Sequence, residues 1–202
     1  MDCDGPPALP VLETARLRLR TLRLDDAMDQ HAYAREPEVA VPGMWEPLPT
    51  LEENRHDIVE TLERQARGEV AAWGIEHRGD RRLIGRCGFV RFRPAHHCAE
   101  VGYALARPYW GQGYMSEAVV TVVAYGFLRL DLHRIEAICL ADNAASIRVL
   151  EKAGFRHEGT AREAYRQHDA YKDLWRYALL RREWTPQEPR SASAGLPETH
   201  AK

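Results

Sequence analysis

The stretch 107-RPYWGQGYMSEA-118 lies between a predicted strand, Glu100–Leu105, and a predicted long amphipathic helix, and this arrangement decides the fold. Gly111 and Gly113 allow the backbone to turn tightly and to approach a ligand with no Cβ atom in the way. The first N–H groups of the helix have no helical partner and carry a partial positive charge, which favours an anion such as a pyrophosphate. Two glycines at this spacing can also serve only to turn the chain, so the motif by itself leaves both interpretations open.

A dinucleotide-binding fold is the rival phosphate-binding interpretation. It needs Gly-x-Gly-x-x-Gly in an N-terminal β-α-β unit, and the chain meets neither condition. The sequence therefore predicts no nicotinamide or flavin cofactor.

Hydrophobic periodicity and turn residues place the other elements. Asp25 is expected to cap a helix, 50-TLEE-53 matches a capping box, and the proline-rich stretch Pro37–Pro49 is expected to be an irregular loop that faces a substrate. The predicted strands are Arg16–Leu24, Val70–Glu76, Leu83–Phe92, His133–Leu140 and Leu174–Leu180, and the predicted helices are Asp25–Arg35, Thr50–Gly68 and Ala144–Ala153. Their order, β-α-α-β-β-β-α-β-α-β, indicates a mixed α/β fold with one parallel β-α-β crossover.

Composition and charge exclude several function classes. Of the 202 residues, 45% are hydrophobic and 29% are charged, and the formal net charge of −2 provides no overall basic field for nucleic acid. No apolar run is long enough for a membrane span, and the start of the chain does not resemble a secretory signal. Residues 1–10 and 186–202 are expected to be disordered tails around one domain, residues 11–185.

The cysteines and histidines do not follow a metal-binding pattern. Cys3, Cys87, Cys98 and Cys139 show no CxxC spacing, which is typical of thiols in a cytoplasmic protein. The cluster 96-HHC-98 could suggest a metal site, but adjacent residues of an extended chain point in opposite directions and no second pair of ligands lies nearby. We therefore expect a polar loop here and no metal.

Three ordered blocks of the sequence carry a family resemblance. They are 13-ETARLRLR-20, 107-RPYWGQGYMSEA-118 and 143-NAASIRVLEKAGF-155. Together they resemble the GNAT superfamily of N-acetyltransferases, and within it the RimJ/RimL branch of ribosomal-protein N-terminal acetyltransferases. Gly111 and Gly113 match the family's acyl-CoA signature, Gln/Arg-x-x-Gly-x-Gly/Ala, whereas its first position falls on Pro108. The resemblance implies a GNAT fold: a single mixed β-sheet with helices on both faces and a splayed parallel strand pair at the CoA site.

The resemblance also implies acetyl-CoA as co-substrate. The turn and the first helical residues would hold its pyrophosphate, the pantetheine arm would enter the gap between the splayed strands, and a backbone N–H near Leu105 would polarise the thioester carbonyl. Asn143 would bond the pantetheine amide, although capping of the next helix explains it equally well. The implied cofactor-binding residues are Tyr103, Leu105, Gln112, Gly113, Tyr114, Met115, Ser116, Asn143 and Ser146.

Acetyl transfer to an amine also needs an acid and a neutral amine. Ser146 is the candidate acid for the departing thiolate in this branch, with a helix-surface serine as the alternative. Glu100 is the candidate base, directly or through water, with a solvated carboxylate as the alternative. Making an α-amine neutral at pH 7 costs about 1.4 kcal/mol, against about 4.6 kcal/mol for a lysine amine. Because no histidine or carboxylate pair is evident in the motifs, the sequence favours an α-amine or a small amine.

Three functions fit these observations. The first is acetylation of a protein or peptide N-terminus by direct transfer in a ternary complex, the second is acetylation of a small amine such as an amino acid or antibiotic, and the third is CoA binding without catalysis. The presence of Ser146 argues against the third. The expected partner is an amine substrate, with no nucleic acid and no membrane, and a homodimer is compatible with the sequence.

Overall fold

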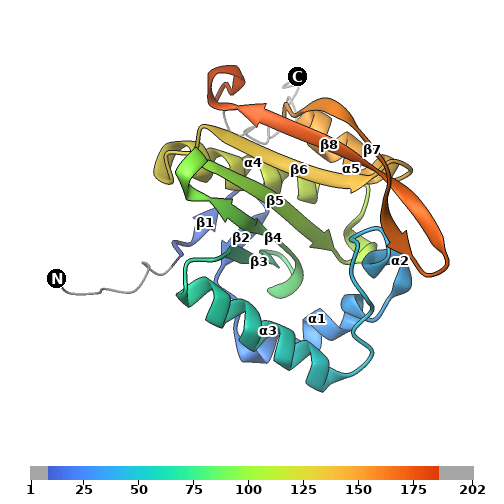
Figure 1. Ribbon diagram of the computed structural model, residues 1–202. Helices are drawn as coiled ribbons and strands as arrows, with labels where there is room; N and C mark the ends of the chain where they lie inside the picture. The colour runs from blue at the N-terminus through green and yellow to red at the C-terminus, as the bar shows by residue number, and fades with distance from the viewer. Residues whose placement is uncertain (1–8, 187–202) are drawn as a thin grey trace, which may run out of the picture.

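A computed structural model describes residues 9–186, which form one eight-stranded sheet in the order β1-β2-β3-β4-β5-β6-β8-β7 (Figure 1). Neighbouring strands pair antiparallel, except for β5 and β6, which pair in parallel. The strands are Leu12–Glu13 (β1), Leu17–Arg20 (β2), Ala71–His77 (β3), Arg82–Arg93 (β4), Cys98–Leu105 (β5), Arg134–Leu140 (β6), Arg156–Gln167 (β7) and Ala170–Leu180 (β8). The helices are Ala27–Ala34 (α1), Pro37–Ala40 (α2), Leu51–Ala66 (α3), Tyr114–Arg129 (α4) and Ala144–Lys152 (α5). The predicted mixed fold, with its single parallel crossover through α4, is confirmed.

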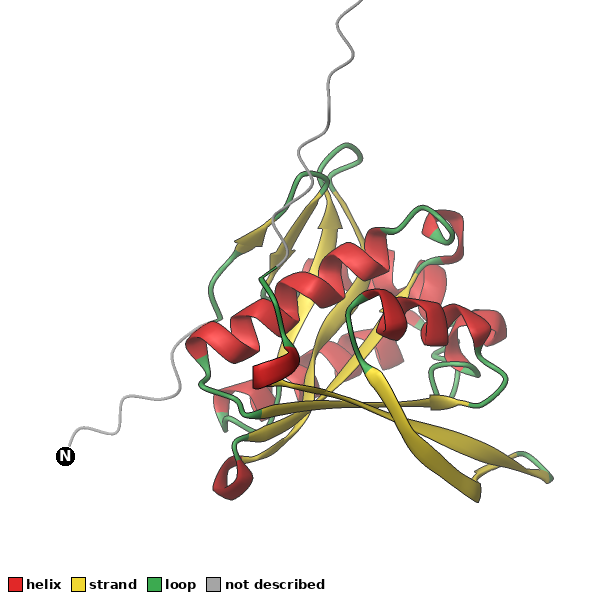
Figure 2. Cartoon of the chain, turned by 90° about the horizontal axis from the view of Figure 1, so that it is seen from above, coloured by secondary structure: helices red, strands yellow, loops and turns green. Residues whose placement is uncertain are grey.

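Helices cover both faces of the sheet, because the strands bury side chains on both sides. Trp73 and Phe89 pack with Val119 of α4 in one hydrophobic cluster. Tyr33 of α1 and Ile58 of α3 pack in a second cluster. Figure 1 shows α1 and α3 on one side of the sheet, and Figure 2 shows α4 and α5 lying side by side over the other. The sheet is therefore the middle layer of three.

The two predicted helix starts turned out differently. Thr50 caps α3 as expected, since its hydroxyl accepts a hydrogen bond from the Glu53 N–H and the Glu53 carboxylate accepts one from the Thr50 N–H at 2.9 Å. Asp26 rather than Asp25 occupies the N-cap position of α1, and its side chain makes no capping hydrogen bond to that helix. The buried Asp26 carboxylate accepts the Arg23 N–H at 2.7 Å and pairs with Arg20 at 2.8 Å.

Several sequence-based assignments were wrong: the short strand β1 was not predicted, and β8 begins at Ala170, before the predicted Leu174. The predicted strand Arg16–Leu24 stops at Arg20, because the chain turns into a 3-10 helix at Leu24. The stretch Pro37–Pro49 contains the short helix α2. Strand β7 was missed entirely, because it lies at the edge of the sheet with most of its side chains exposed and so shows no hydrophobic alternation.

The predicted tails lie largely outside the described residues and stay predictions. The first described residues contact the domain, since the Trp73 indole N–H donates to the Pro10 carbonyl at 2.9 Å. None of the helices in residues 9–186 combines the length and the hydropathy needed to cross a membrane.

Candidate active site

The glycine turn before α4 has the backbone conformation that an anion site requires. Gly111 and Gly113 have φ values of +75° and +82°, in the left-handed region that favours glycine. The first helical hydrogen bond runs from the Glu117 N–H to the Gly113 carbonyl at 3.1 Å. The N–H groups of the three residues before Glu117 therefore have no partner within the helix and remain available to a ligand.

The N-terminal segment braces this turn. Arg16 forms an ion pair with Glu117 of α4 at 2.7 Å and donates to the Gln112 carbonyl at 2.9 Å. The Thr14 hydroxyl donates to the same Glu117 carboxylate at 2.5 Å. The Arg16 guanidinium also lies 4.2 Å from the centre of the Tyr114 ring. These contacts hold the glycine turn against the first turn of α4. They also neutralise the charge of Glu117, whose carboxylate lies beside the predicted anion site.

Strands β5 and β6 separate beside the turn. Their parallel pairing ends with Glu100 opposite Glu136, so the rest of β5 diverges from β6. A cavity of about 660 Å³ occupies the gap, a volume typical of small-molecule and cofactor sites. All of the predicted site residues line this cavity except Gln112, whose side chain turns back to donate to the Pro108 carbonyl at 2.9 Å.

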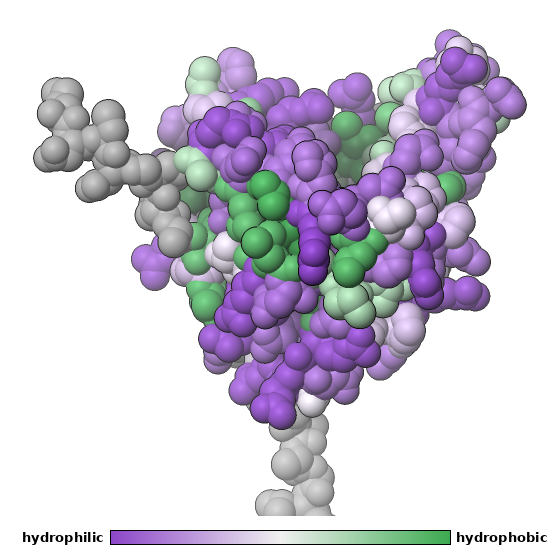
Figure 3. Space-filling model, turned by 90° about the horizontal axis from the view of Figure 1, so that it is seen from below, coloured by the Kyte–Doolittle hydropathy of each residue, from purple (hydrophilic) through white to green (hydrophobic). Residues whose placement is uncertain are grey.

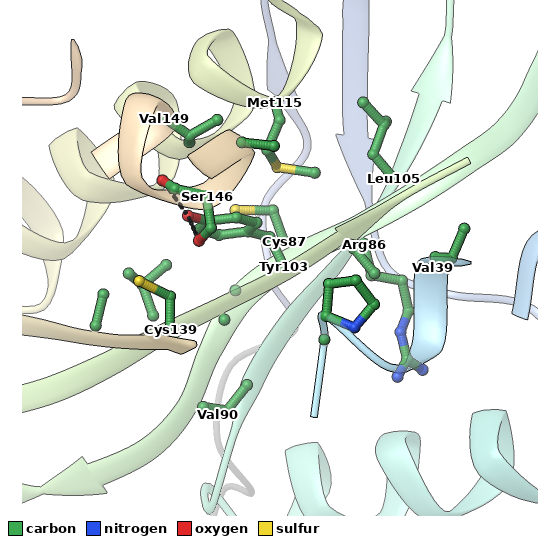
Figure 4. Close-up of a pocket in the computed structure, with 18 of the residues that line it drawn as sticks. Val39, Arg86, Cys87, Val90, Tyr103, Leu105, Met115, Cys139, Ser146 and Val149 are labelled. Atoms are coloured by element: carbon green, nitrogen blue, oxygen red, sulfur yellow. Dashed lines mark hydrogen bonds between the residues drawn. The ribbon is translucent and has the colours of Figure 1, made fainter. Parts of the chain in front are cut away.

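The cavity opens toward both faces of the sheet. Figure 4 shows Tyr103, Ser146 and Met115 on one side of β5, and Arg86 and Val90 on the other. The first group comes from the face that carries α4 and α5, and the second from the face that carries α1 and α3. The space-filling view from the α1 and α3 side is mostly hydrophilic, with hydrophobic side chains gathered in separate patches (Figure 3). Two different molecules can thus meet in the gap from opposite directions.

Ser146 and Tyr103 form the polar centre on the α5 side. Their hydroxyl oxygens are 2.8 Å apart. Burial raises the pKa of the Tyr103 phenol above its usual value, with a smaller opposing effect of the Ser146 hydrogen bond. A buried phenol next to a cavity keeps its proton at neutral pH and can donate it in a hydrogen bond.

Asn143 caps α5, as one of its two interpretations predicted. Its side-chain oxygen accepts the Ser146 N–H at 3.0 Å. Its side-chain nitrogen donates to the Pro42 carbonyl at 3.3 Å, which ties the Pro37–Pro49 stretch to α5. The contact with a pantetheine amide stays a prediction.

Glu100 lies on the opposite face of β5 from Tyr103, because side chains alternate along a strand. Its carboxylate lines the cavity and lies 3.7 Å from the Arg91 guanidinium. Three residues of strand separate Glu100 from Tyr103, or about 10 Å. Glu100 and Tyr103 therefore face opposite sides of the cavity, and the role of Glu100 as base, directly or through water, stays a prediction.

Comparison with known proteins decides the family. A family model for the acetyltransferase (GNAT) domain matches residues 16–156. The chain belongs to the GNAT family. It is 36% identical over 175 residues to an uncharacterized N-acetyltransferase, YoaA, of Bacillus subtilis strain 168, an alignment that spans 85% of this chain and 97% of YoaA.

Other relatives carry names from the RimJ/RimL branch. The chain is 27% identical over 183 residues to the ribosomal protein uS5-alanine N-acetyltransferase of Escherichia coli K12, covering 87% of this chain and 93% of that enzyme. A solved structure of RimL, a ribosomal L7/L12 α-N-protein acetyltransferase in complex with coenzyme A, superposes with a TM-score of 0.76 at 23% identity, over 85% of this chain and 98% of RimL. At that identity the likeness concerns the fold. The predicted GNAT fold and the RimJ/RimL-like resemblance are confirmed.

Two cysteines of this GNAT domain line the cavity. Burial raises the pKa of the Cys139 thiol to about 11, with a smaller opposing effect of Ser146, and burial also raises the pKa of Cys87. A thiol with a raised pKa carries little thiolate at neutral pH and is a poor nucleophile.

On the α1 and α3 side of the cavity, the sequence predicted only the Pro37–Pro49 stretch, which does line it. Arg86 of β4 pairs with Asp57 of α3 at 2.7 Å and lines the cavity. Val39 of α2 lines it as well, and the Gln167 side chain of the β7–β8 hairpin donates to the Val41 carbonyl at 3.1 Å. Because adjacent side chains of a strand point to opposite faces, the sequence could have placed Arg86 on the face opposite Cys87. No pattern in the sequence indicates that β4, α2 and the β7–β8 hairpin come together.

The 96-HHC-98 cluster makes other contacts. The Cys98 thiol lies 3.1 Å from an Arg93 guanidinium nitrogen, and the His97 ring lies 3.2 Å from the Asp131 carbonyl oxygen. Within the part of the chain that the structure describes, no group of three or more His, Cys, Asp or Glu side chains is placed to hold a metal ion.

Proposed function

We propose that this GNAT protein transfers the acetyl group of acetyl-CoA to the N-terminal α-amine of a protein or peptide, by direct transfer in a ternary complex. The observation that carries the proposal is the cavity between β5 and β6, which is reached from both faces of the sheet. Acetyl-CoA can occupy one side of the cavity and the amine the other, so that the acetyl group passes directly from the donor to the amine in the gap between β5 and β6.

The α4 side suits the donor. The turn at Gly113 presents backbone N–H groups to a diphosphate. Beyond Glu100 the cavity edge of β5 has no partner strand on its β6 side. An extended pantetheine arm with two amides can pair with such an edge as an added strand would. The family as a whole uses acetyl-CoA.

Direct transfer is favoured over an acyl-enzyme. A two-step reaction would need a nucleophile that takes the acetyl group first. The pKa values of Cys87 and Cys139 are both raised by burial, so the thiols that line the cavity are weak nucleophiles at neutral pH.

An α-amine suits the acceptor side better than a lysine amine. Deprotonation of an α-amine costs about 3 kcal/mol less at pH 7 than that of a lysine. Glu100 is the carboxylate on the acceptor face of β5, at the start of the gap, and its help, directly or through water, is sufficient for the less costly deprotonation of an α-amine. The names of the ribosomal-protein relatives support the same acceptor class.

The test is release of CoA thiol from acetyl-CoA with three groups of acceptors. The first group is peptides with free N-termini of Ala, Ser, Met and Gly, the second is the same peptides with a blocked N-terminus and an internal lysine, and the third is free amino acids and aminoglycosides. We expect turnover with the first group and at least a hundredfold lower kcat/KM with the second. Mass spectrometry of the peptide should locate the acetyl group on the N-terminal nitrogen.

Two results would contradict parts of the proposal. Turnover confined to the third group would replace the peptide acceptor with a small amine and leave the donor assignment intact. Acetylated protein isolated after incubation with acetyl-CoA alone, and able to pass its acetyl group to a peptide, would replace direct transfer with an acyl-enzyme route.

A further inference from the structure

The charged side chains of the cavity are not balanced. Those in its lining are Glu38, Arg64, Arg86, Glu100, Arg148 and Lys152. The first four have partners of opposite charge within 4 Å: Arg107, Glu69, Asp57 and Arg91, respectively. Arg148 and Lys152 have no ion-pair partner among residues 9–186. The cavity lining therefore carries an excess of positive charge at Arg148 and Lys152.

These two residues lie on the donor side. Arg148 and Lys152 are exposed residues of α5, four positions apart, so they share one face of the helix. Val149, between them in sequence, also lines the cavity (Figure 4). Helix α5 packs beside α4, whose N-terminus holds the glycine turn (Figure 2). The cavity therefore has two separate positive features on this side, the α4 N-terminus and the pair on α5.

We propose that Arg148 and Lys152 form a subsite for the 3′-phosphate of acetyl-CoA. The inference rests on the proposed donor, which carries two separate anionic groups. The diphosphate takes the backbone N–H groups at the α4 N-terminus. The 3′-phosphomonoester carries about −1.5 to −2 charge at pH 7, and two cations one helical turn apart match it in charge.

The two side chains divide the task by their chemistry. A guanidinium binds two phosphate oxygens in a fixed plane, and an ammonium acts as a compact point charge on a flexible stem. Because both are exposed, their attraction to the phosphate is screened by salt. The subsite therefore makes recognition of acetyl-CoA over its 3′-dephospho form dependent on ionic strength.

The experiment is calorimetric binding of acetyl-CoA and of 3′-dephospho-acetyl-CoA at 50 mM and 300 mM salt. Wild type is expected to bind acetyl-CoA at least tenfold more tightly than the dephospho form at low salt, with a smaller ratio at high salt. The double variant Arg148→Ala/Lys152→Ala is expected to lose at least tenfold in affinity for acetyl-CoA and to bind the dephospho form as wild type does. The matched control is Arg55→Ala/Arg129→Ala, which removes two exposed helical arginines that do not line the cavity and is expected to change neither affinity.

The outcomes separate this inference from the proposed function. Equal affinity of wild type for both ligands, or an equal loss of both in the α5 double variant, overturns the subsite while the acetyl-CoA site stands. Failure of wild type to bind either ligand overturns the donor assignment and the subsite with it. A loss of acetyl-CoA affinity in the control variant as large as in the α5 variant shows a general charge effect and also overturns the subsite.

Discussion

The hydroxyl oxygen of Tyr103 on β5 lies 2.8 Å from the hydroxyl oxygen of Ser146 on α5. The contact joins the diverging end of β5 to the first turn of α5, at the wall of the cavity. Because burial keeps the Tyr103 phenol protonated, the phenol can donate a hydrogen bond to the Ser146 hydroxyl, which in turn can donate to the departing thiolate. The predicted acid would thus be a pair of hydroxyls rather than one.

The first prediction concerns this pair. Ser146→Ala should lower turnover by about a hundredfold, as expected for loss of a general acid, and the loss should stay or deepen as pH rises, because a thiolate is then harder to protonate. Tyr103→Phe should give a smaller loss with the same pH trend. The measurement is a pH–rate profile with the best peptide. Tyr109→Phe is the matched control, since its hydroxyl donates to Asp80 at 2.7 Å. A Ser146→Ala profile that recovers at high pH would remove Ser146 from the acid role.

The second prediction concerns Glu100. Glu100→Gln should lower turnover by about a hundredfold near pH 7, and the loss should shrink as pH rises, because more of the amine is already neutral. Acetyl-CoA affinity should hold. The control is Glu136→Gln. Glu136 lies opposite Glu100 in the β5–β6 pairing, and it does not line the cavity. Equal effects of the two substitutions across the pH range would show that Glu100 has no part in the chemistry.

The third prediction separates ligand contact from backbone strain. Gly113→Val should lower acetyl-CoA affinity at least tenfold, about 1.4 kcal/mol, because the new side chain occupies the anion site. Gly68→Val is the matched control: Gly68 also has a positive φ of +72°, has no atom within 4 Å of an added Cβ, and lies outside the cavity lining. Both variants should lose about 1–2 kcal/mol of stability. Unchanged acetyl-CoA binding in Gly113→Val, measured by calorimetry, would remove the anion site from the α4 N-terminus.

The fourth prediction tests the start of α1. Asp26→Ala should lower the free energy of unfolding by about 3–5 kcal/mol, because it leaves the Arg20 guanidinium buried with one partner fewer. Asp25→Ala changes an exposed neighbour and should cost less than about 0.5 kcal/mol. Urea unfolding of both variants is the measurement. A larger loss of stability in Asp25→Ala than in Asp26→Ala would show that Asp25 is the more important residue at the start of α1.

The fifth prediction is that a chelator leaves the reaction intact. Neither the proposed acid nor the proposed base needs a metal, so protein dialysed against EDTA should keep its full rate of thiol release. Elemental analysis of the same sample gives the metal content. If stoichiometric zinc were removed together with activity, the prediction would be wrong and residues 96–98 would be a candidate metal site.

The α4 and α5 side of the cavity was predictable because local patterns define it. A strand, two glycines and an amphipathic helix are contiguous in the sequence, and the third block of family resemblance, from Asn143 to Phe155, contains Ser146. The other wall combines the expected Pro37–Pro49 stretch with Arg86, while Gln167 holds that stretch in place, and these residues lie far apart in the chain. Nothing short-range indicates that they meet. Asp26 was missed for a related reason: its burial depends on Arg20, which only the folded chain brings alongside it.

The Pro37–Pro49 stretch is anchored through its own backbone. Three side chains from other segments, Asn54, Asn143 and Gln167, donate to its main-chain carbonyls, those of Leu48, Pro42 and Val41. Every amino acid presents such a carbonyl, so these three contacts do not depend on which side chains the stretch carries. The exposed side chains of the stretch can therefore diverge in evolution, or be randomised in a library, while the buried Val39 and Ala40 and these backbone contacts keep the stretch in place over the cavity. Changes at those exposed positions need not disturb the glycine turn, α4 and α5 on the other side of the cavity.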